Sequence, residues 1–201
     1  MFDLFAGLGL GYIFGSFPSA VVVARLSGRN IFEVGSGNMG AMNTARNIGW
    51  LPGVVVFLLD IAKGAAPVVI AQLLTTDSSD ATRLVMPLAA GSGAVAGHAW
   101  SAFAGLRGGK ALATTLGVAL PVYPVAALYT LLLLIALVLI TRRTTLSALV
   151  AIAAYPAVVM AVLLPSGVDQ DRAFAILTSV LVIAGIVVYK HLSSPRSRRT
   201  S

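Results

Sequence analysis

The sequence predicts an all-α polytopic membrane protein with about seven transmembrane helices, one of them short or re-entrant. Composition points to a bilayer, because 58% of the residues are apolar and only 10% are charged, with a mean hydropathy of +0.92. The 201 residues accommodate about seven helices of about 20 residues each, joined by short connections. Lys and Arg gather in alternate connections, which gives the predicted helices an orientation.

Apolar runs separated by polar residues lie at 4–24, 51–74, 83–104, 111–122, 124–141, 147–164 and 173–190. No basic segment precedes the first run, so we expect a retained span there and not a cleaved signal peptide. Glycines recur every four residues in the first and third runs, at Gly7, Gly11 and Gly15 and at Gly93 and Gly97. This spacing allows close contact between helices.

The fourth run is too short to cross a bilayer. Lys110 and Arg142 are both expected on the cytoplasmic side, although the chain between them is too short for two full spans. A helix of about 12 residues rises about 18 Å, whereas the hydrocarbon core is about 30 Å thick. We therefore expect 111–122 to be a short or re-entrant helix that turns at Pro121 and Pro124, beside a polar cavity.

Basic residues predict the orientation of the chain. Four segments carry the excess of positive charge: Arg25, Arg29 and Arg46; Arg107 and Lys110; Arg142 and Arg143; and Lys190, Arg196, Arg198 and Arg199. Since positive loops stay in the cytoplasm, the N-terminus is expected outside and the C-terminus inside. We expect one integral-membrane domain over residues 1–192 and a basic cytoplasmic tail over 193–201.

A glycine-rich polar segment, Gly35–Arg46, follows the first run. Its formal match to G-x-G-x-x-G is spurious, because no strand precedes it and no βαβ unit surrounds it. Glycines here let backbone N–H groups point inward as an anion-binding nest, to which polar side chains add further donors. The candidate residues are Gly35, Ser36, Gly37, Asn38, Asn43 and Arg46. A flexible loop is the alternative, but an ordinary turn rarely needs so many amides, hydroxyls and a cation.

A second glycine cluster follows the third run, with candidate residues at Arg107, Gly108, Gly109, Lys110 and Thr114. It fails the Walker pattern for nucleotide hydrolysis, because Ala104 replaces the first glycine and Ala111 replaces the magnesium-binding hydroxyl residue. A glycine turn with two cations at the membrane boundary remains, which suits an anionic group. Taken alone, this cluster is more simply interpreted as a positive-inside anchor.

Ionisable residues also occur within the apolar runs. Asp60 and Lys63 share one helix face, where we expect a structural ion pair. His98 is expected to position a partner by hydrogen bonding, and His191 is expected to be a cation at a helix end. Neither has companion ligands at metal spacing, so we expect no metal and no cofactor.

Several kinds of chemistry are unsupported by the sequence. The chain has no cysteine, and we find no Ser–His–Asp candidate, no paired carboxylates and no nucleic-acid signature. Any reaction must therefore rely on an activated substrate, such as one with a phosphate leaving group that cations and amides hold.

At these residues the chain resembles the bacterial acyl-phosphate:glycerol-3-phosphate acyltransferase family, PlsY. The matching motifs are Gly15-Ser16-Phe17-Pro18, Gly35-Ser36-Gly37-Asn38 through Arg46 and Gly49, Asp60-x-x-Lys63-Gly64, Gly97-His98, and Gly108-Gly109-Lys110 with Ala113-Thr114 and Gly117. The resemblance implies a seven-helix enzyme of the bacterial inner membrane that transfers an acyl group from acyl phosphate to the 1-hydroxyl of glycerol 3-phosphate. The products would be lysophosphatidic acid and phosphate, and membrane lipids would surround the enzyme.

The resemblance also implies roles for particular residues. Candidate catalytic residues are Ser36, Arg46, Lys110, His98 and His191, of which the first three resemble the phosphate-binding set. Candidate substrate-binding residues are Gly35, Gly37, Asn38, Asn43, Arg107, Gly108, Gly109 and Thr114.

The chain departs from the family pattern at four places. Met42 replaces the usual Thr, Ala111 replaces the glycine after Lys110, and Trp100-Ser101 stands where Phe-Pro is common. The segment after His191 lacks the family's asparagine. These departures leave two alternatives open. One is an acyltransferase paralogue with a changed acceptor, and the other is a transporter or lipid-binding scaffold for anionic solutes or headgroups. The sequence predicts no particular oligomeric state.

Overall fold

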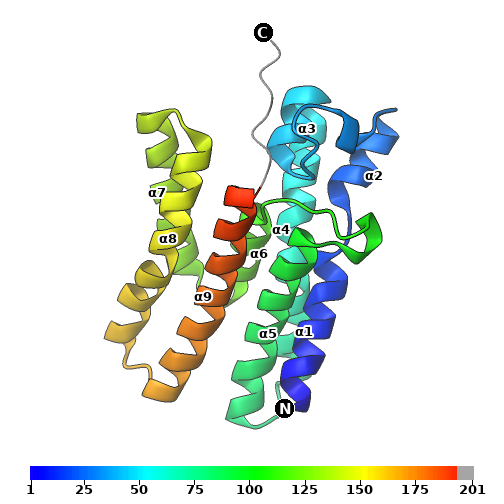
Figure 1. Cartoon of the computed structure of the whole chain (residues 1–201). Helices are drawn as coiled ribbons and strands as arrows, with labels where there is room; N and C mark the ends of the chain where they lie inside the picture. The colour runs from blue at the N-terminus through cyan, green and yellow to red at the C-terminus, as the bar shows by residue number, and fades with distance from the viewer. Residues whose placement is uncertain (194–201) are drawn as a thin grey trace.

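The computed structural model describes residues 1–193, and every regular element within them is a helix. The α-helices are α1 (Phe2–Gly15), α2 (Ser19–Leu26), α3 (Ala41–Asn47), α4 (Trp50–Leu74), α5 (Asp80–Ala99), α6 (Leu112–Val122), α7 (Pro124–Thr141), α8 (Thr144–Leu163) and α9 (Gln170–Ser193). Three short 3-10 helices are η1 (Ile31–Glu33), η2 (Ala102–Ala104) and η3 (Leu164–Ser166). Figure 1 shows the long helices running side by side as one bundle. The predicted all-α class is confirmed.

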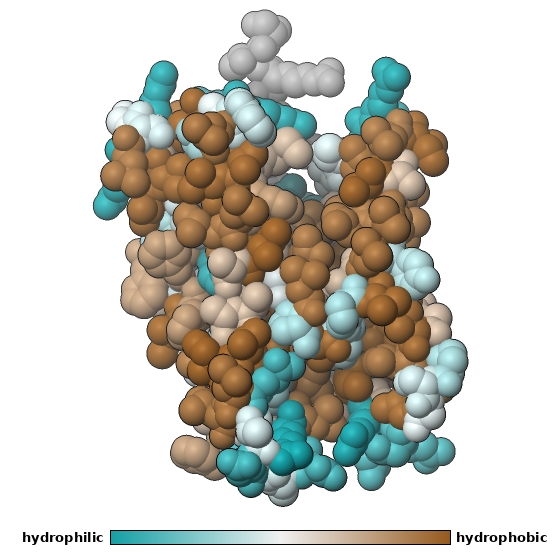
Figure 2. Space-filling model, turned by 180° about the vertical axis from the view of Figure 1, so that it is seen from behind, coloured by the Kyte–Doolittle hydropathy of each residue, from teal (hydrophilic) through white to brown (hydrophobic). Residues whose placement is uncertain are grey.

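Five stretches are long and apolar enough to cross a membrane: Phe2–Leu26, Trp50–Leu74, Pro124–Thr141, Thr144–Ser166 and Gln170–Ser193. The two other predicted runs correspond to α5, which is rich in glycine and alanine, and to α6, which is short at 11 residues, as predicted. Figure 2 shows apolar side chains over most of one face of the bundle, with hydrophilic residues gathered toward its two ends. This distribution is typical of a membrane protein.

The basic segments lie at one end of the bundle. In Figure 1 the N-terminus is at the lower end, whereas α3, the α7–α8 connection and, somewhat lower, the C-terminal end of α9 are toward the upper end. Arg46, Arg142 and Lys190 therefore share an end, as their charges predict. The remaining basic residues of the predicted tail, at 196, 198 and 199, lie outside the described residues, and Ser193 belongs to α9.

The first apolar run corresponds to one candidate span, Phe2–Leu26, but it is divided into the two helices α1 and α2. Pro18 has no N–H to donate and disfavours helical backbone at Phe17, so α1 ends before these residues and α2 begins after them. Lys63 Nζ donates to the Phe17 carbonyl at 2.8 Å, and Ser101 Oγ donates to the Ser16 carbonyl. Side chains from distant elements thus satisfy the carbonyls that the break releases, as an apolar environment requires.

The third and fourth runs also differ in detail from the prediction. The third was expected to reach residue 104, but α5 ends at Ala99 and Trp100 leaves the helical conformation. Tyr12 Oη donates to the Trp100 carbonyl at 2.8 Å, which fixes the start of the loop that follows. The chain turns at Tyr123, so Pro121 lies within the last turn of α6 and not at the turn.

Glycines bring α1 and α5 into backbone contact, as their spacing predicts. A Cβ on Gly11 would lie 1.9 Å from the Ala90 carbonyl oxygen, and one on Gly15 would lie 2.1 Å from that of Ala94. From the other side, a Cβ on Gly93 would lie 2.3 Å from the Leu8 carbonyl oxygen. No side chain larger than hydrogen fits at these positions.

We expect Gly11→Val to destabilise the bundle far more than Gly9→Val does. Both positions are in α1, but a Cβ at Gly9 meets nothing within 4 Å, so the control has the same change in helix propensity without the clash. The expected difference in unfolding free energy is about 3 kcal/mol, which is typical of severe overpacking. Thermal unfolding of the detergent-solubilised variants measures it, and equal melting temperatures would contradict the close α1–α5 contact.

A small apolar cluster anchors the glycine-rich segment to the bundle. Ile31 and Met39, on either side of its first glycines, are buried together with Ala24 of α2 and Val56 of α4. The segment between them is therefore fixed at both ends, which favours a defined conformation over a flexible loop.

Candidate functional site

The candidate residues lie on two loops and on the ends of two helices. The glycine-rich segment precedes α3, and the loop 100–111 follows α5. His98 is near the C-terminal end of α5, and His191 is near that of α9. In Figure 1 the glycine-rich segment lies at the upper end of the bundle, whereas the loop 100–111 and the C-terminal ends of α5 and α9 lie lower, toward its middle.

Asn43, on α3, holds the glycine-rich segment in shape. Its Oδ1 accepts the backbone N–H of Ser36 at 3.1 Å, and its Nδ2 donates to the carbonyls of Val34 and Asn38, each at 3.1 Å. Asn47 Nδ2 donates to the same Oδ1 at 3.0 Å. An asparagine amide has two donor hydrogens and two acceptor lone pairs, and all of them are used here. Asn43 therefore orders the loop and has no hydrogen-bonding capacity left for a ligand.

Two left-handed glycines flank Ser36. Gly35 has φ 58° and Gly37 has φ 67°, a conformation that side chains disfavour. Ser36 is exposed between them, and Arg46 is exposed in the last turn of α3. No side-chain hydrogen bond or ion pair engages either residue within the described chain, so both are available to an anion.

The loop 100–111 folds back against the end of α5. Gly109 N–H donates to the His98 carbonyl at 3.1 Å. A Cβ on Gly109 would lie 2.2 Å from His98 Nε2 and 3.0 Å from the Met39 carbonyl oxygen. A Cβ on Gly108 would similarly lie 2.2 Å from the His98 carbonyl oxygen. Gly109 is thus the point where His98, the glycine-rich segment and the loop with Lys110 meet.

Arg107 makes a second link between the two loops. Its guanidinium carbon lies 4.8 Å from the ring centroid of Phe32, within the range of a cation–π interaction. Together with the contact at Gly109, this stacking holds the two glycine-containing loops beside each other.

Lys110 is a half-buried cation. Within residues 1–193 its ammonium makes no hydrogen bond or ion pair, and partial burial lowers its pKa from the ordinary lysine value. His191 is close enough for its charge to interact with that of Lys110. His191 Nδ1 lies 2.8 Å from the Val187 carbonyl; because a carbonyl only accepts, Nδ1 carries the proton. Nε2 of His191 is the nitrogen left for another partner.

The way in which α9 is held at this site was not predicted from the sequence. Lys190 Nζ lies 5.4 Å from the Trp100 ring centroid, and the Trp100 and Tyr189 ring centroids are 5.9 Å apart. These contacts dock the end of α9 on the start of the loop 100–111. From the sequence Trp100 stands out only as a departure from the family pattern, since nothing local connects it with Lys190.

Thr114 lies deeper in the bundle than the other candidates. It is buried on α6, and a Cβ on Gly64 of α4 would lie 2.3 Å from its carbonyl oxygen. Its hydroxyl has no hydrogen-bonding partner within residues 1–193. The structure therefore places Thr114 at the α4–α6 contact, below the loop that holds Lys110.

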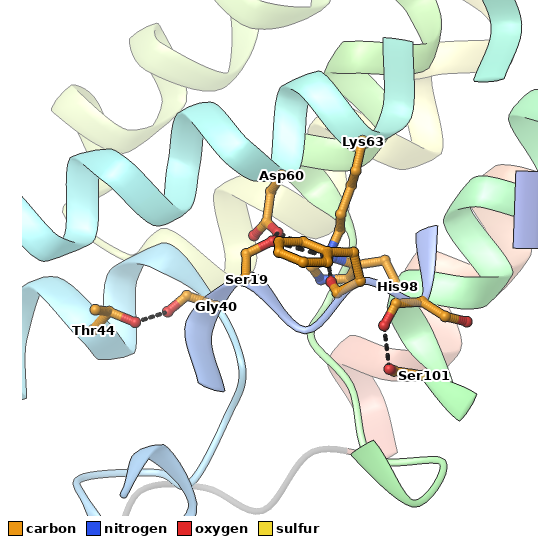
Figure 3. Close-up of polar contacts among 9 residues, drawn as sticks. Ser19, Gly40, Thr44, Asp60, Lys63, His98 and Ser101 are labelled. Carbon is orange, nitrogen blue, oxygen red and sulfur yellow. Dashed lines mark hydrogen bonds and ion pairs between the residues drawn. The ribbon is translucent and has the colours of Figure 1, made fainter. Parts of the chain in front are cut away.

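A buried polar cluster lies behind His98. Asp60 Oδ1 is 2.9 Å from Lys63 Nζ and accepts Ser19 Oγ at 3.0 Å, so the expected ion pair is present. The same oxygen lies 3.5 Å from His98 Nδ1. Figure 3 shows Asp60 and Lys63 descending from α4 toward Ser19 and His98. The contact with His98 was not predicted from the sequence, because α4 and α5 come together only through tertiary packing.

Ala111 adopts a strained conformation beside Lys110. Its φ is 59°, in the left-handed region that costs a non-glycine residue about 1 kcal/mol or more. We expect Ala111→Gly to raise the melting temperature, whereas Ala113→Gly, in the first turn of α6, should lower it through loss of helix propensity. Thermal unfolding of both variants tests this, and a lower melting temperature for Ala111→Gly would contradict the strain.

Most of the chain matches known proteins. The model of a family described as glycerol-3-phosphate acyltransferase matches residues 5–199. The chain belongs to the glycerol-3-phosphate acyltransferase family. This acyltransferase is 38% identical over 190 residues to the glycerol-3-phosphate acyltransferase of Geobacter sulfurreducens, covering 94% of this chain and 91% of that one. It is 34% identical over 192 residues to that of Bacillus cytotoxicus, covering 95% and 89% of the two chains.

Solved structures agree with the sequence relatives. The acyltransferase matches the crystal structure of PlsY, an integral membrane glycerol 3-phosphate acyltransferase, in its glycerol 3-phosphate form. The TM-score is 0.77 with 32% identity, over 96% of this chain and 89% of the other. The lysophosphatidic acid form of PlsY matches with a TM-score of 0.77 and 31% identity, over 95% and 88% of the two chains. The protein is therefore a multi-pass membrane acyltransferase, and the resemblance to the PlsY family is confirmed.

Proposed function

We propose that this acyltransferase moves a fatty acyl group from acyl phosphate to the 1-hydroxyl of glycerol 3-phosphate at the cytoplasmic face of the bacterial inner membrane. Family membership supports the reaction. The gathering of basic residues at one end of the bundle supports that end as the cytoplasmic one, with the N-terminus outside.

The half-buried ammonium of Lys110 is the observation that carries the proposal. A half-buried cation loses part of its hydration, and within residues 1–193 no carboxylate compensates it. An anionic phosphate would compensate it, and the Gly109 contact with His98 fixes the loop beside it. His191 lies within electrostatic range of Lys110. Lys110 would therefore hold the phosphate of the donor and stabilise its charge as it leaves.

The glycine-rich segment would supply the remaining phosphate contacts. Ser36 and Arg46 are exposed, and Asn43 holds the backbone around them through its saturated amide. Met39 and Phe32 bring this segment against Gly109 and Arg107, which places both loops around one region. Ser36 and Arg46 would bind phosphate oxygens there, with Asn38 as a supporting group.

An apolar groove offers a place for the fatty chain. It lies between α4, α6, α7 and α8, and includes Leu112 and Ala113, which lie just after Lys110 in the sequence. An acyl chain lying there would have its activated carbonyl next to the Lys110 loop.

The transfer needs no covalent enzyme intermediate. The glycerol hydroxyl oxygen attacks the acyl carbonyl carbon, a new C–O ester bond forms, and the bond from that carbon to the phosphate oxygen breaks. The phosphate departs with the bonding electron pair, and the hydroxyl proton passes to a phosphate oxygen. His98 and His191 would orient the reactants, and binding both substrates together supplies much of the acceleration.

Phosphate release from palmitoyl phosphate, measured with and without glycerol 3-phosphate, tests the reaction. We expect release to depend on the acceptor and to yield lysophosphatidic acid in equal amount. Release that ignores glycerol 3-phosphate would overturn the proposed acceptor. Uptake of glycerol 3-phosphate into proteoliposomes without any acyl product would favour a transporter instead.

A further inference from the structure

Asp60 is an ionised residue in an apolar part of the bundle, where a charge is costly and usually serves a function. It is 2% exposed. One of its oxygens, Oδ1, receives Ser19 Oγ at 3.0 Å and Lys63 Nζ at 2.9 Å. These contacts compensate the carboxylate, but they do not explain why a carboxylate is present at all.

Lys63 has its own structural reason to be there. Its ammonium donates at 2.8 Å to the Phe17 carbonyl, which the helix break before α2 leaves without an intrahelical donor. A neutral amide would serve that carbonyl without a charge to balance. The ion pair therefore exceeds what the helix break requires.

His98 spans the distance between Asp60 and the candidate site. Its Nδ1 lies 3.5 Å from Asp60 Oδ1 and has no closer hydrogen-bonding partner within residues 1–193. Its other nitrogen, Nε2, faces Gly109 on the loop that holds Lys110. Such a contact is often long without substrate and shortens in the complex. A carboxylate at Nδ1 selects the ring form that carries a proton there. This determines whether Nε2 donates or accepts a hydrogen bond.

We propose that Asp60 is a positioning residue of the transfer reaction: it holds Nδ1–H of His98 and thereby fixes Nε2 toward the glycine loop beside Lys110. The inference rests on the proposed function insofar as His98 orients a reactant. Lys63 keeps Asp60 ionised and ties the pair to the break between α1 and α2. Ser19, the first residue of α2, orients the carboxylate (Figure 3).

The competing explanation is that Asp60 only neutralises Lys63. Asp60→Asn alone does not separate the two, because an unpaired buried ammonium would destabilise the fold. Asp60→Asn combined with Lys63→Gln removes both charges and keeps an amide donor for the Phe17 carbonyl. If Asp60 only neutralises Lys63, this double variant should regain wild-type activity.

We expect the double variant to keep its fold but lose kcat by about a hundredfold, as misplaced catalytic groups do, with little change in KM for glycerol 3-phosphate. In a His98→Ala background the same two changes should lower kcat by less than about threefold, because Asp60 then has no histidine to position. Ser92→Ala is the matched control. It removes a partly buried hydrogen bond, 3.1 Å to Ser179 Oγ, away from this cluster, and should leave kcat near wild type. Wild-type kcat in the double variant, or full additivity with His98→Ala, would overturn the inference.

A second measurement does not depend on catalysis. The chain has only two histidines, so nitrogen NMR of ¹⁵N-histidine-labelled protein resolves both rings, with His191→Gln to assign them. We expect Nδ1 of His98 to be protonated in the wild type and to lose this preference in the double variant. An unprotonated Nδ1, or an unchanged spectrum in the double variant, would overturn the positioning role even if the wild type catalysed the proposed transfer. Absence of acyl transfer with the expected spectra would instead reject the proposed function alone.

Discussion

Replacing Lys110 by methionine is expected to lower kcat/KM for acyl transfer by about 10²–10³-fold, the effect of losing one charge-stabilising donor in an active site. Methionine keeps much of the side-chain length and removes the ammonium. The melting temperature should not fall, because partial burial already disfavours the charged form of Lys110 and lowers its pKa. Steady-state phosphate release, with thermal unfolding of the same preparation, measures both effects.

Arg143→Met is the matched control for Lys110→Met. Arg143 is an exposed cation at the same end of the bundle, in the connection between α7 and α8. It should retain wild-type kinetics, since loss of one surface charge alters only the general potential at that end. Equal losses in the two variants would mean that the basic end acts through its total charge and that Lys110 has no specific role.

Gly109→Ala is expected to lower kcat by about a hundredfold or more, although it adds only one methyl group. Gly109 is not in the left-handed region, so alanine is compatible with its backbone. The added Cβ would lie 2.2 Å from His98 Nε2, and either the imidazole or the Lys110 loop must move. Kinetics with each substrate varied in turn would show the loss mainly in kcat.

Gly105→Asn in the same loop provides the comparison for Gly109→Ala. A Cβ there meets nothing within 4 Å, and the φ of 62° is one that asparagine tolerates. Its activity should stay close to wild type. Wild-type kcat in Gly109→Ala would show that the close approach of this loop to His98 does not matter for turnover.

Much of the fold was predictable, because apolar runs and glycine spacing are local patterns. The run around α6 was correctly predicted to be short from the charges that flank it. The break before Pro18 was not predicted, since the residues around it remain apolar. Its released carbonyls are satisfied by Lys63 and Ser101, which are distant in sequence. A proline in an apolar run implies that polar partners for the released carbonyls lie elsewhere in the chain.

The parts of the site that are formed by motifs continuous in the sequence could be predicted. Two glycine-rich segments were predicted to suit an anionic group. In the structure they lie side by side through contacts at Gly109 and Arg107. What each side chain does required tertiary information. Asn43 proved to be saturated by its own loop, and the partner of His98 proved to be Asp60. No local pattern links residues of α4 and α5 across the bundle.

The backbone contact between α1 and α5 also restricts how a lipid reaches this enzyme. At Gly11 and Gly15 the two helices approach so closely that not even a methyl group fits between them. A hydrocarbon chain is wider than a methyl group, so this wall is closed to lateral entry from the membrane. Fatty substrates and their acylated products must therefore pass through another side of the bundle.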